Sequence, residues 1–336
     1  MTGPARDERE LFGAAVRRAV EAHAEDGAGL DAALRVLGWH DALAADARLA
    51  ITALFECQGA VHATSSALGH VMRAGLGPYV DPLAAPDEGT VAVVLPALGR
   101  WDPPGTVAGG LVVDGLGGAG LAAASLATVP ARGGDGDVVV VVPIGDLAPA
   151  PVAALDPWMG LTAVHARQAA KMSPVSLAPV SLAPGAWDAA VDLARLALAH
   201  ELVGAAAAML ALARAHALAR VQFGRPIAAF QAVRHRLADT VVSVEGARAV
   251  LDAAWEHPSA DAAATAKATA GRAARTAARH AQQVLAGMGF TTEHPLHRYV
   301  RRVLVLDELF GSARALTAAL GRDVLARRRL PPPLAL

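Results

Sequence analysis

Charged and amide side chains gather in one short segment, residues 220–239, with the sequence RVQFGRPIAAFQAVRHRLAD. Arg220, Gln222, Arg225 and Gln231 follow one another closely in this segment. Guanidinium and amide groups held at a fixed turn can donate several directed hydrogen bonds to a phosphate or to a purine. The segment therefore predicts contact with a ligand that carries such groups.

Two helices are expected to position this segment. Ala and Leu dominate residues 191–219, which contain no proline, and apolar residues recur at helical spacing after residue 231. Gly224 interrupts the pattern between the two stretches. Pro226 is expected to open the second helix, because proline is favoured at the first helical position. The sequence thus predicts a helix–turn–helix corner.

The corner resembles the flavin-contacting segment of the acyl-CoA dehydrogenase family, in which an Arg, a Gln or Thr, and a Phe precede Gly-Arg/Lys-Pro-Ile and a Phe-Gln pair. Residues 283–293, QVLAGMGFTTE, resemble a second motif of that family, Gln-x-x-Gly-Gly-x-Gly-aromatic-x-x-Glu. In family dimers such residues face the FAD of the neighbouring subunit, where a guanidinium suits the diphosphate. The cofactor-binding residues that the resemblance implies are Arg220, Gln222, Phe223, Gln231, Gln283 and Gly287.

The catalytic base of the family has no acidic counterpart at either of its usual positions. Acyl-CoA dehydrogenation needs a carboxylate that takes the α-proton and a flavin that accepts the β-hydride. Family members usually supply this carboxylate from a Glu before Gly-Thr/Ser, and the aligned residue is Phe310. Relatives with the base on an earlier helix have Glu before Arg-Leu, and the aligned residue there is Ala194. Neither side chain can remove a proton.

Glu201 is the remaining candidate for the base. It lies seven residues beyond Ala194, which is about two helical turns and therefore roughly the same helix face. A Glu in an Ala-rich helix can instead form an ion pair, here with Arg195, with His200 or with a partner chain. Asp307 and Glu308 are less suitable, because they are expected to point to a different face from Phe310.

The rest of the chain predicts three regions. In the first region, apolar residues recur mostly at helical spacing. Over the whole chain, Ala and Leu rather than aromatic residues supply most of the 54% hydrophobic content, which favours helices. Short β-branched runs at 90–95, 106–113 and 138–142 predict antiparallel strands. The predicted domains are an N-terminal helical domain at 1–84, a middle β domain at 85–186 and a C-terminal helical bundle at 187–330.

This order matches the acyl-CoA dehydrogenase fold, which has an N-terminal all-α domain, a small middle β-barrel domain and a C-terminal four-helix bundle. The middle region departs from the family, however. It lacks the aromatic-x-Thr/Ser element and the Thr-Glu-x-x-x-Gly-Ser-Asp loop that hold the flavin ring. The glycine-rich turn at 117–120 has no Lys or Ser, so it does not predict a phosphate-binding loop.

Composition limits the other classes of partner. A net charge of −1 gives no general field that would recruit nucleic acid or an anionic membrane. One cysteine, Cys57, excludes an internal disulfide and a cysteine-based zinc site, and no metal site is predicted. The sequence shows neither a signal peptide nor a continuously apolar stretch of about 20 residues, so we expect a cytoplasmic protein.

These observations favour a subunit that pairs with a catalytically complete homologue and completes the partner's FAD site. The reaction implied by the resemblance is α,β-desaturation of an acyl-CoA thioester, with electrons passed to an electron-transfer flavoprotein. Short subunits of heteromeric family members act on steroid-derived or related CoA thioesters in lipid or steroid catabolism. Two alternatives stay open: a self-sufficient homo-oligomeric dehydrogenase that uses Glu201, and a non-enzymatic scaffold or binding homologue.

Overall fold

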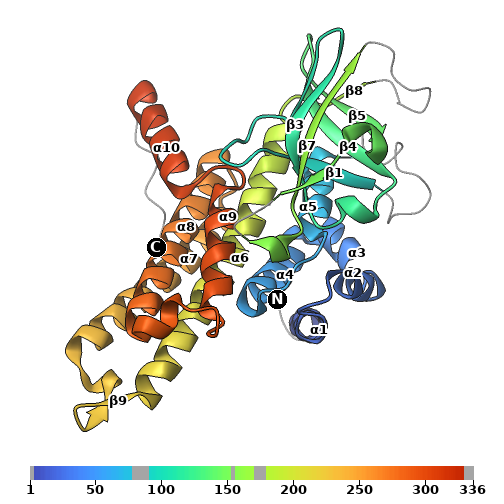
Figure 1. The fold of residues 1–336 in the computed structure, drawn as a ribbon. Coiled ribbons are helices and arrows are strands. Elements are labelled where there is room, and N and C mark those ends of the chain that lie inside the picture. Colours follow the sequence, from blue (N-terminus) through green and yellow to red (C-terminus); the bar gives the residue numbers. More distant parts are fainter. Residues whose placement is uncertain (1–3, 78–90, 153–155, 170–178, 329–336) are drawn as a thin grey trace.

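The computed structural model describes residues 4–77, 91–152, 156–169 and 179–328, and Figure 1 shows a sheet flanked by two helical regions. In the N-terminal region, carboxylates cap two of the helices: Asp26 and Asp46 accept hydrogen bonds from the backbone N–H groups of Gly29 and Leu49. Its helices are α1 (Pro4–Ala22), α2 (Gly27–Val36), α3 (Trp39–Ala45), α4 (Ala47–Val61) and α5 (Ala67–Leu76).

The middle region is built around one mixed sheet, with the strand order β6-β7-β3-β1-β4-β5-β8 and β2 beside β3 and β4. Short 3-10 turns interrupt it at η2 (Leu121–Ala123), η3 (Ile144–Leu147) and η4 (Pro157–Met159). The strands are β1 (Val91–Pro96), β2 (Gly105–Val107), β3 (Gly110–Gly117), β4 (Leu126–Arg132), β5 (Asp137–Pro143), β6 (Ala150–Pro151), β7 (Thr162–Ala169) and β8 (Val180–Ser181).

The expectation of antiparallel strands is wrong for β4 beside β1 and β2, where the pairing is parallel; the other pairings of the described sheet are antiparallel. The β-branched runs located β1 and β5, and the single run at 106–113 covers parts of two strands, β2 and β3. The strands β4 and β7 were missed, since Ala, Pro and Arg dilute their apolar pattern. Among the described strands, the pairings end at β6 and β8 without joining these two. The described strands therefore form a sheet, and the predicted closure into a barrel is not established.

The valine run of β5 shows how the sheet joins the helices. Side chains alternate along a strand, so Val139 and Val141 pack into the main core shared with the helical bundle. Val140 and Val142 pack into a separate cluster inside the middle region. Burial on both faces explains why this strand is continuously apolar rather than alternating.

The C-terminal region is a helical bundle, as expected, with a small hairpin between its first two helices. Its elements are α6 (Ala186–Ala219), β9 (Val221–Gln222), β10 (Arg225–Pro226), η5 (Ile227–Ala229), α7 (Gln231–Glu256), α8 (Ala260–Leu285), η6 (Ala286–Phe290), α9 (Leu296–Glu308) and α10 (Ala313–Arg327). Pro226 does not open a helix. It pairs with Val221 in the hairpin, and α7 begins at Gln231.

The long helix α6 is the central element of the fold. It is long and apolar enough to cross a membrane, but 72% of its most apolar window is buried inside the protein, as in a core helix. It crosses α4 where Gly59 and Gly204 lie against the opposite backbone. A Cβ on Gly204 would overlap the carbonyl oxygen of Glu56, and a Cβ on Gly59 would overlap that of Glu201. This close crossing fixes α6 against the N-terminal helices.

The helix–sheet–helix order predicted from the sequence is confirmed. The predicted boundary between residues 84 and 85 lies outside the described residues. At the second boundary, α6 begins at Ala186, the last residue assigned to the middle domain. The division into three separate domains stays a prediction.

Candidate functional site

Both flavin-motif segments lie at helix ends. The hairpin follows α6 and η6 follows α8, and Figure 1 shows β9 at the end of the bundle far from the sheet. Because α7 returns between them, α6 and α8 run in the same direction. The end of α6 lies near the residues that follow η6: burial lowers the pKa of His294, and His216 near the end of α6 contributes to that shift. We call residues 220–231 and 283–290 the motif end.

The hairpin has a two-residue turn at Phe223 and Gly224, with φ values of 54° and 76°. Positive φ at both positions is the geometry of a type I′ turn, which matches the twist of paired strands. A phenylalanine rarely adopts this conformation. Phe223 is 91% exposed. The turn thus presents an aromatic ring to the outside rather than to the core.

The other motif residues are also on the surface. Arg220, Gln222 and Gln231 are exposed, as are Gln283 and Gly287. A Cβ at Gly287 would meet no atom within 4 Å, so nothing in this chain requires a glycine there. Arg225 stacks on Phe230 with 4.5 Å between its guanidinium carbon and the ring centroid. The motif end therefore offers donors and apolar surface that the chain itself leaves largely uncovered.

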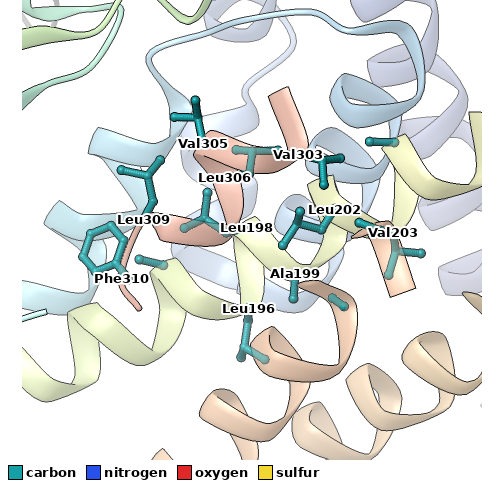
Figure 2. Close-up of a cluster of buried hydrophobic side chains, with 14 of the residues drawn as sticks. Leu196, Leu198, Ala199, Leu202, Val203, Val303, Val305, Leu306, Leu309 and Phe310 are labelled. Atoms are coloured by element: carbon teal, nitrogen blue, oxygen red, sulfur yellow. The ribbon is translucent and has the colours of Figure 1, made fainter. Parts of the chain in front are cut away.

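The two usual positions of the base lie in the interior instead. Ala194 is completely buried and Phe310 is 1% exposed, and both belong to the main hydrophobic core. Figure 2 shows Phe310 beside Leu309 and close to Leu198 of α6. The Nε of Arg195 donates to the carbonyl oxygen of Phe310 at 3.2 Å, which ties the two positions together.

A buried lysine holds the loop that carries Phe310. The Nζ of Lys267 donates to the carbonyl oxygens of Leu306 and Asp307, at 2.9 and 3.0 Å, where α9 ends. Cations are favoured at helix C-termini, yet complete burial lowers the pKa of Lys267 to about 8. The carboxylate of Asp307 accepts from the Nε of Arg275 at 2.6 Å and from the backbone of Ala313 at 3.0 Å. Both carboxylate oxygens of Asp307 therefore accept hydrogen bonds from within the chain.

Glu201, the remaining candidate base, is 3% exposed and forms an ion pair with Arg302. The Nη1 of Arg302 donates to its carboxylate at 3.1 Å, and the Nε2 of Gln58 donates at 3.2 Å. Burial raises the pKa of Glu201, while Arg302 acts in the opposite direction. Glu201 does not pair with the suggested Arg195 or His200: Arg195 pairs with Asp192 at 3.5 Å, and the partner of Glu201 is Arg302 of α9. The role of Glu201 as the base stays a prediction.

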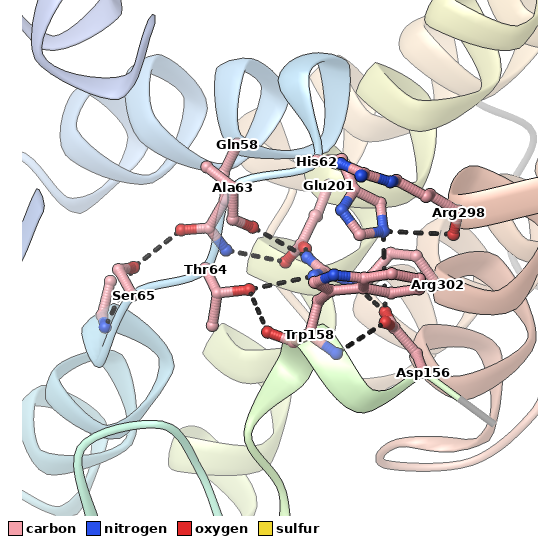
Figure 3. A network of polar contacts seen from close by, with 11 residues as sticks. Gln58, His62, Ala63, Thr64, Ser65, Asp156, Trp158, Glu201, Arg298 and Arg302 are labelled. Atoms are coloured by element: carbon pink, nitrogen blue, oxygen red, sulfur yellow. Dashed lines mark hydrogen bonds and ion pairs between the residues drawn. The ribbon is translucent and has the colours of Figure 1, made fainter. Parts of the chain in front are cut away.

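Arg302 is the centre of a buried polar network that joins all three regions (Figure 3). Its Nε donates to Asp156 at 2.5 Å, its Nη1 to the carbonyl of Ala63 at 2.8 Å and its Nη2 to the hydroxyl of Thr64 at 2.9 Å. Asp156 belongs to the middle region, whereas residues 63 and 64 follow α4 and Glu201 lies on α6. One guanidinium therefore connects the N-terminal helices, the middle region and the bundle. We call this group the Arg302 network.

Sequence reasoning missed the Arg302 network, although α9 carries a signal for it. Arg302 lies four and seven residues before Leu306 and Leu309, on the face that is otherwise apolar. A charged residue on a core-facing stripe predicts a buried partner. Asp156 could not be chosen as that partner from the sequence, because 146 residues separate the two.

A cavity of about 250 Å³ lies beside this network, between the N-terminal helices, the sheet, α6 and α9. Its buried wall includes Gln58, Leu198, Glu201, Arg302, Leu306 and Leu309, and neither Ala194 nor Phe310 lines it. Its outer part is formed by exposed residues of α2 and by the segment 118–124, which includes η2. We call it the interdomain cavity. Within the described residues, no group of His, Cys, Asp or Glu side chains is arranged to hold a metal ion.

Comparison with known proteins gives one consistent result. Residues 186–325 match the family described as the acyl-CoA dehydrogenase C-terminal domain. Acyl-CoA dehydrogenase IpdE2 of Mycobacterium tuberculosis is 37% identical over 194 residues, which cover 56% of this chain and 57% of that protein. The chain thus spans less than two thirds of that relative.

Two solved structures share the fold over nearly the whole chain. The ChsE4–ChsE5 complex from Mycobacterium tuberculosis has a TM-score of 0.77 at 24% identity. The match covers 99% of this chain and 99% of the matched chain of that structure. The Tcur3481–Tcur3483 steroid ACAD has a TM-score of 0.78 at 24% identity, over 97% of this chain and 99% of its own. At this level of identity the likeness establishes the fold.

Proposed function

We propose that the chain, whose residues 186–325 match the acyl-CoA dehydrogenase C-terminal domain, is a subunit that completes the FAD site of a catalytically complete homologous partner. In this reading the assembly carries out α,β-desaturation of an acyl-CoA thioester. The chain contributes binding groups to the partner's cofactor and supplies no base of its own. It is active only as part of an oligomer.

The observation that carries the proposal is the contrast between the two sets of family positions. The residues that match the family's FAD-contacting positions are exposed at the motif end, where another chain can reach them. The positions of the base are an alanine and a phenylalanine, both buried in the main core. A chain that retains the first set and has lost the second is suited to serve a neighbour's active site.

The residues of the motif end fit FAD chemically. The guanidinium of Arg220 suits a diphosphate, and the amides of Gln222 and Gln231 can bond to polar groups of the cofactor. Exposed Gln283 can do the same for an adenine, and Gly287 permits close approach of the backbone. When bound in the partner, FAD accepts the hydride in the oxidation of the thioester.

The names of two solved neighbours support a proposal for the substrate class and the further partners. One is named as a steroid ACAD and the other is the ChsE4–ChsE5 complex. We propose a steroid-derived or related bulky CoA thioester as the substrate, a homologous chain as the partner and an electron-transfer flavoprotein as the acceptor, in cytoplasmic lipid or steroid catabolism.

Coexpression with the product of a neighbouring homologous gene tests this proposal. The co-complex should contain FAD and desaturate an acyl-CoA, whereas the chain alone should do neither. Arg220→Ala should lower the flavin content of the co-complex, while Arg272→Ala, an exposed arginine on α8, should leave it unchanged. Unchanged flavin content in Arg220→Ala, or a colourless and inactive co-complex, contradicts the proposal and favours the scaffold alternative.

A second candidate is a self-sufficient dehydrogenase that uses Glu201. Its supporting observation is that this carboxylate lines the interdomain cavity and has a raised pKa caused mainly by burial, as general bases often have. Under this alternative the chain alone binds FAD and reduces it with an acyl-CoA, and Glu201→Gln abolishes the reduction. Full activity of Glu201→Gln in the co-complex excludes this role.

A further inference from the structure

The hairpin of the motif end lies at the end of the bundle, far from the sheet (Figure 1). Its strands β9 and β10 pair over two residues each. A hairpin of two short strands is only marginally stable in water by itself. At its base, the backbone N–H of Ile227 donates to the carbonyl oxygen of Arg220 at 2.8 Å. The shape of the hairpin must therefore also depend on contacts between side chains.

The turn is the least favourable part of the hairpin backbone. Phe223 has a φ of 54°, in the left-handed region that residues other than glycine rarely adopt. Its ring meets the ring of Phe230 edge to face, with 6.2 Å between the ring centroids and 88° between the ring planes. Aromatic pairs favour this arrangement. The ring contact therefore stabilises a turn that the backbone of Phe223 disfavours.

The same ring of Phe230 also contacts strand β10. The guanidinium carbon of Arg225 lies 4.5 Å from the ring centroid of Phe230, which is within the range of a cation–π contact. Within the described residues no carboxylate forms an ion pair with Arg225, so the ring is the partner that orients its guanidinium. One side chain thus holds both the turn and the second strand.

Phe230 occupies a helix position where phenylalanine is not expected. It is the N-cap residue of α7, and its side chain makes no capping hydrogen bond. Ser, Asp and Asn are favoured there, because their side-chain oxygens accept hydrogen bonds from the first turn. The backbone of Phe230 is nevertheless anchored, since its carbonyl oxygen accepts from the N–H groups of Val233 and Arg234 at 3.1 Å each. The ring therefore serves the hairpin rather than the cap of the helix.

We propose that Phe230 is a positioning residue, which fixes the hairpin against the start of α7 and so holds Arg220 and Gln222 in place for the partner's FAD. Arg225 acts through this ring rather than by contact with the cofactor. The inference rests on the proposed function, because it concerns the same FAD contacts. A fixed hairpin binds more tightly than a mobile one, since less conformational freedom is lost on association.

Tryptic digestion of the chain alone tests whether Phe230 fixes the hairpin. Cleavage after Arg220 requires the hairpin to open, and mass spectrometry follows this site separately from the others. Cleavage should be about tenfold faster in Phe230→Ser and within about twofold of the parent rate in Phe230→Tyr, which keeps the ring. Leu325→Ser, which truncates an exposed apolar side chain on α10, is the control and should leave this rate unchanged. An unchanged rate in Phe230→Ser overturns the proposal.

The variant Phe230→Ser also separates positioning from stability. Serine is a better N-cap than phenylalanine, so the free energy of unfolding of the chain alone should not fall. The FAD dissociation constant of the co-complex should nevertheless rise about tenfold, and Phe230→Tyr should keep it within about twofold of the parent value. Phe230→Leu, which is apolar but has no aromatic face, gives the same test if Phe230→Ser does not fold. Equal loss of FAD binding in Phe230→Tyr overturns the role of the ring.

The variant Arg225→Gln distinguishes action through the ring from direct contact with the cofactor. Arg225→Gln combined with Phe230→Ser should weaken FAD binding no more than either change alone, because both remove the same contact. Losses that multiply in the double variant would mean that Arg225 contacts the cofactor itself, which contradicts the proposal.

The positioning role and the proposed function fail separately. If Arg220→Ala lowers the flavin content of the co-complex and Phe230→Ser does not, the proposed function stands and the positioning role is overturned. If neither variant changes the flavin content, the proposed function fails, and the tryptic digestion of the chain alone still decides whether Phe230 fixes the hairpin.

Discussion

Arginine has opposite roles in the Arg302 network and at the motif end. Arg302 is 1% exposed and donates to four oxygen atoms that come from all three regions. Arg220 lies at the exposed end of α6, in a corner whose Phe223 ring is 91% exposed. The first guanidinium is satisfied within the chain, whereas the second is exposed on the surface.

This contrast between the two arginines indicates that the buried one contributes to stability and that the exposed one has another role. Removing one member of a buried ion cluster leaves uncompensated charge in the interior and destabilises the protein strongly. An exposed arginine contributes little to stability, so its presence in a family motif points to a ligand or a partner. We therefore expect substitutions in the interior to change the free energy of unfolding, and substitutions at the motif end to change flavin content.

The largest effect is expected for Arg302→Ala. Asp156 and Glu201 would remain buried without their counter-charge, and we expect the free energy of unfolding to fall by about 3–5 kcal/mol. Denaturant unfolding of the chain measures this loss. Arg314→Ala, an exposed arginine on α10, should cost less than about 0.5 kcal/mol. A loss below about 1 kcal/mol for Arg302→Ala would show that the network is not a main contributor to the junction.

The two regions also differ in how far the sequence revealed them. The corner between two helices was predictable, because its residues are close together in the chain and local turn chemistry determines its form. Even so, the role of Pro226 was wrong: the type I′ turn at Phe223 and Gly224 makes it a strand partner. The helix–sheet–helix order was also visible, since long periodic helices and β-branched runs are local signals.

The interior was not predictable in the same way. Glu201 was recognised as unusual, but its partner Arg302 comes from a helix 101 residues away, and one sequence gives no register between distant helices. The parallel pairing of β4 with β1 was missed for the same reason. Pairings over long separations depend on packing of the whole fold rather than on local pattern.

A smaller loss is expected where α4 crosses α6. Gly204→Ala would force a methyl group against the carbonyl of Glu56, and we expect a loss of about 1–3 kcal/mol from overpacking. Gly246→Ala is the matched control: this glycine is exposed on α7, and a methyl group there would meet no atom within 4 Å. Alanine there should stabilise by up to about 1 kcal/mol. Equal effects at the two glycines would contradict the close crossing.

Lowering the pH should reduce the free energy of unfolding, because the buried histidines become protonated more readily in the unfolded chain. Burial is the main cause that lowers the pKa of His62 and His200 to about 4 and that of His70 to about 3, from an ordinary value of 6.5. Between pH 6.5 and 4 the unfolded chain therefore binds more protons than the folded chain. The free energy of unfolding should fall as pH falls through this window, by up to about 1.4 kcal/mol per pH unit for each such group.

The variant His200→Gln checks this pH dependence. Trp255 donates to the Nε2 of His200 at 3.0 Å, and a glutamine carbonyl can accept the same hydrogen bond. Unfolding curves between pH 4 and 7 should be less steep in pH for His200→Gln than for the parent chain. His257→Gln, exposed after α7, is the control, and an unchanged slope for His200→Gln would assign the acid sensitivity to other groups.

The smallest effect on stability is expected at the motif end. Arg220→Ala and Phe223→Ser should change the free energy of unfolding of the chain alone by no more than about 0.5 kcal/mol, because both side chains are exposed and neither fills the core. Denaturant unfolding of the chain alone and flavin content of the co-complex are the paired measurements. A stability loss above about 1 kcal/mol for Arg220→Ala would mean that the corner is a folding element and that its arginine does not differ in kind from Arg302. Unchanged stability together with lost flavin would instead separate the two arginines, because it would show that Arg220 contributes to flavin binding and not to the fold.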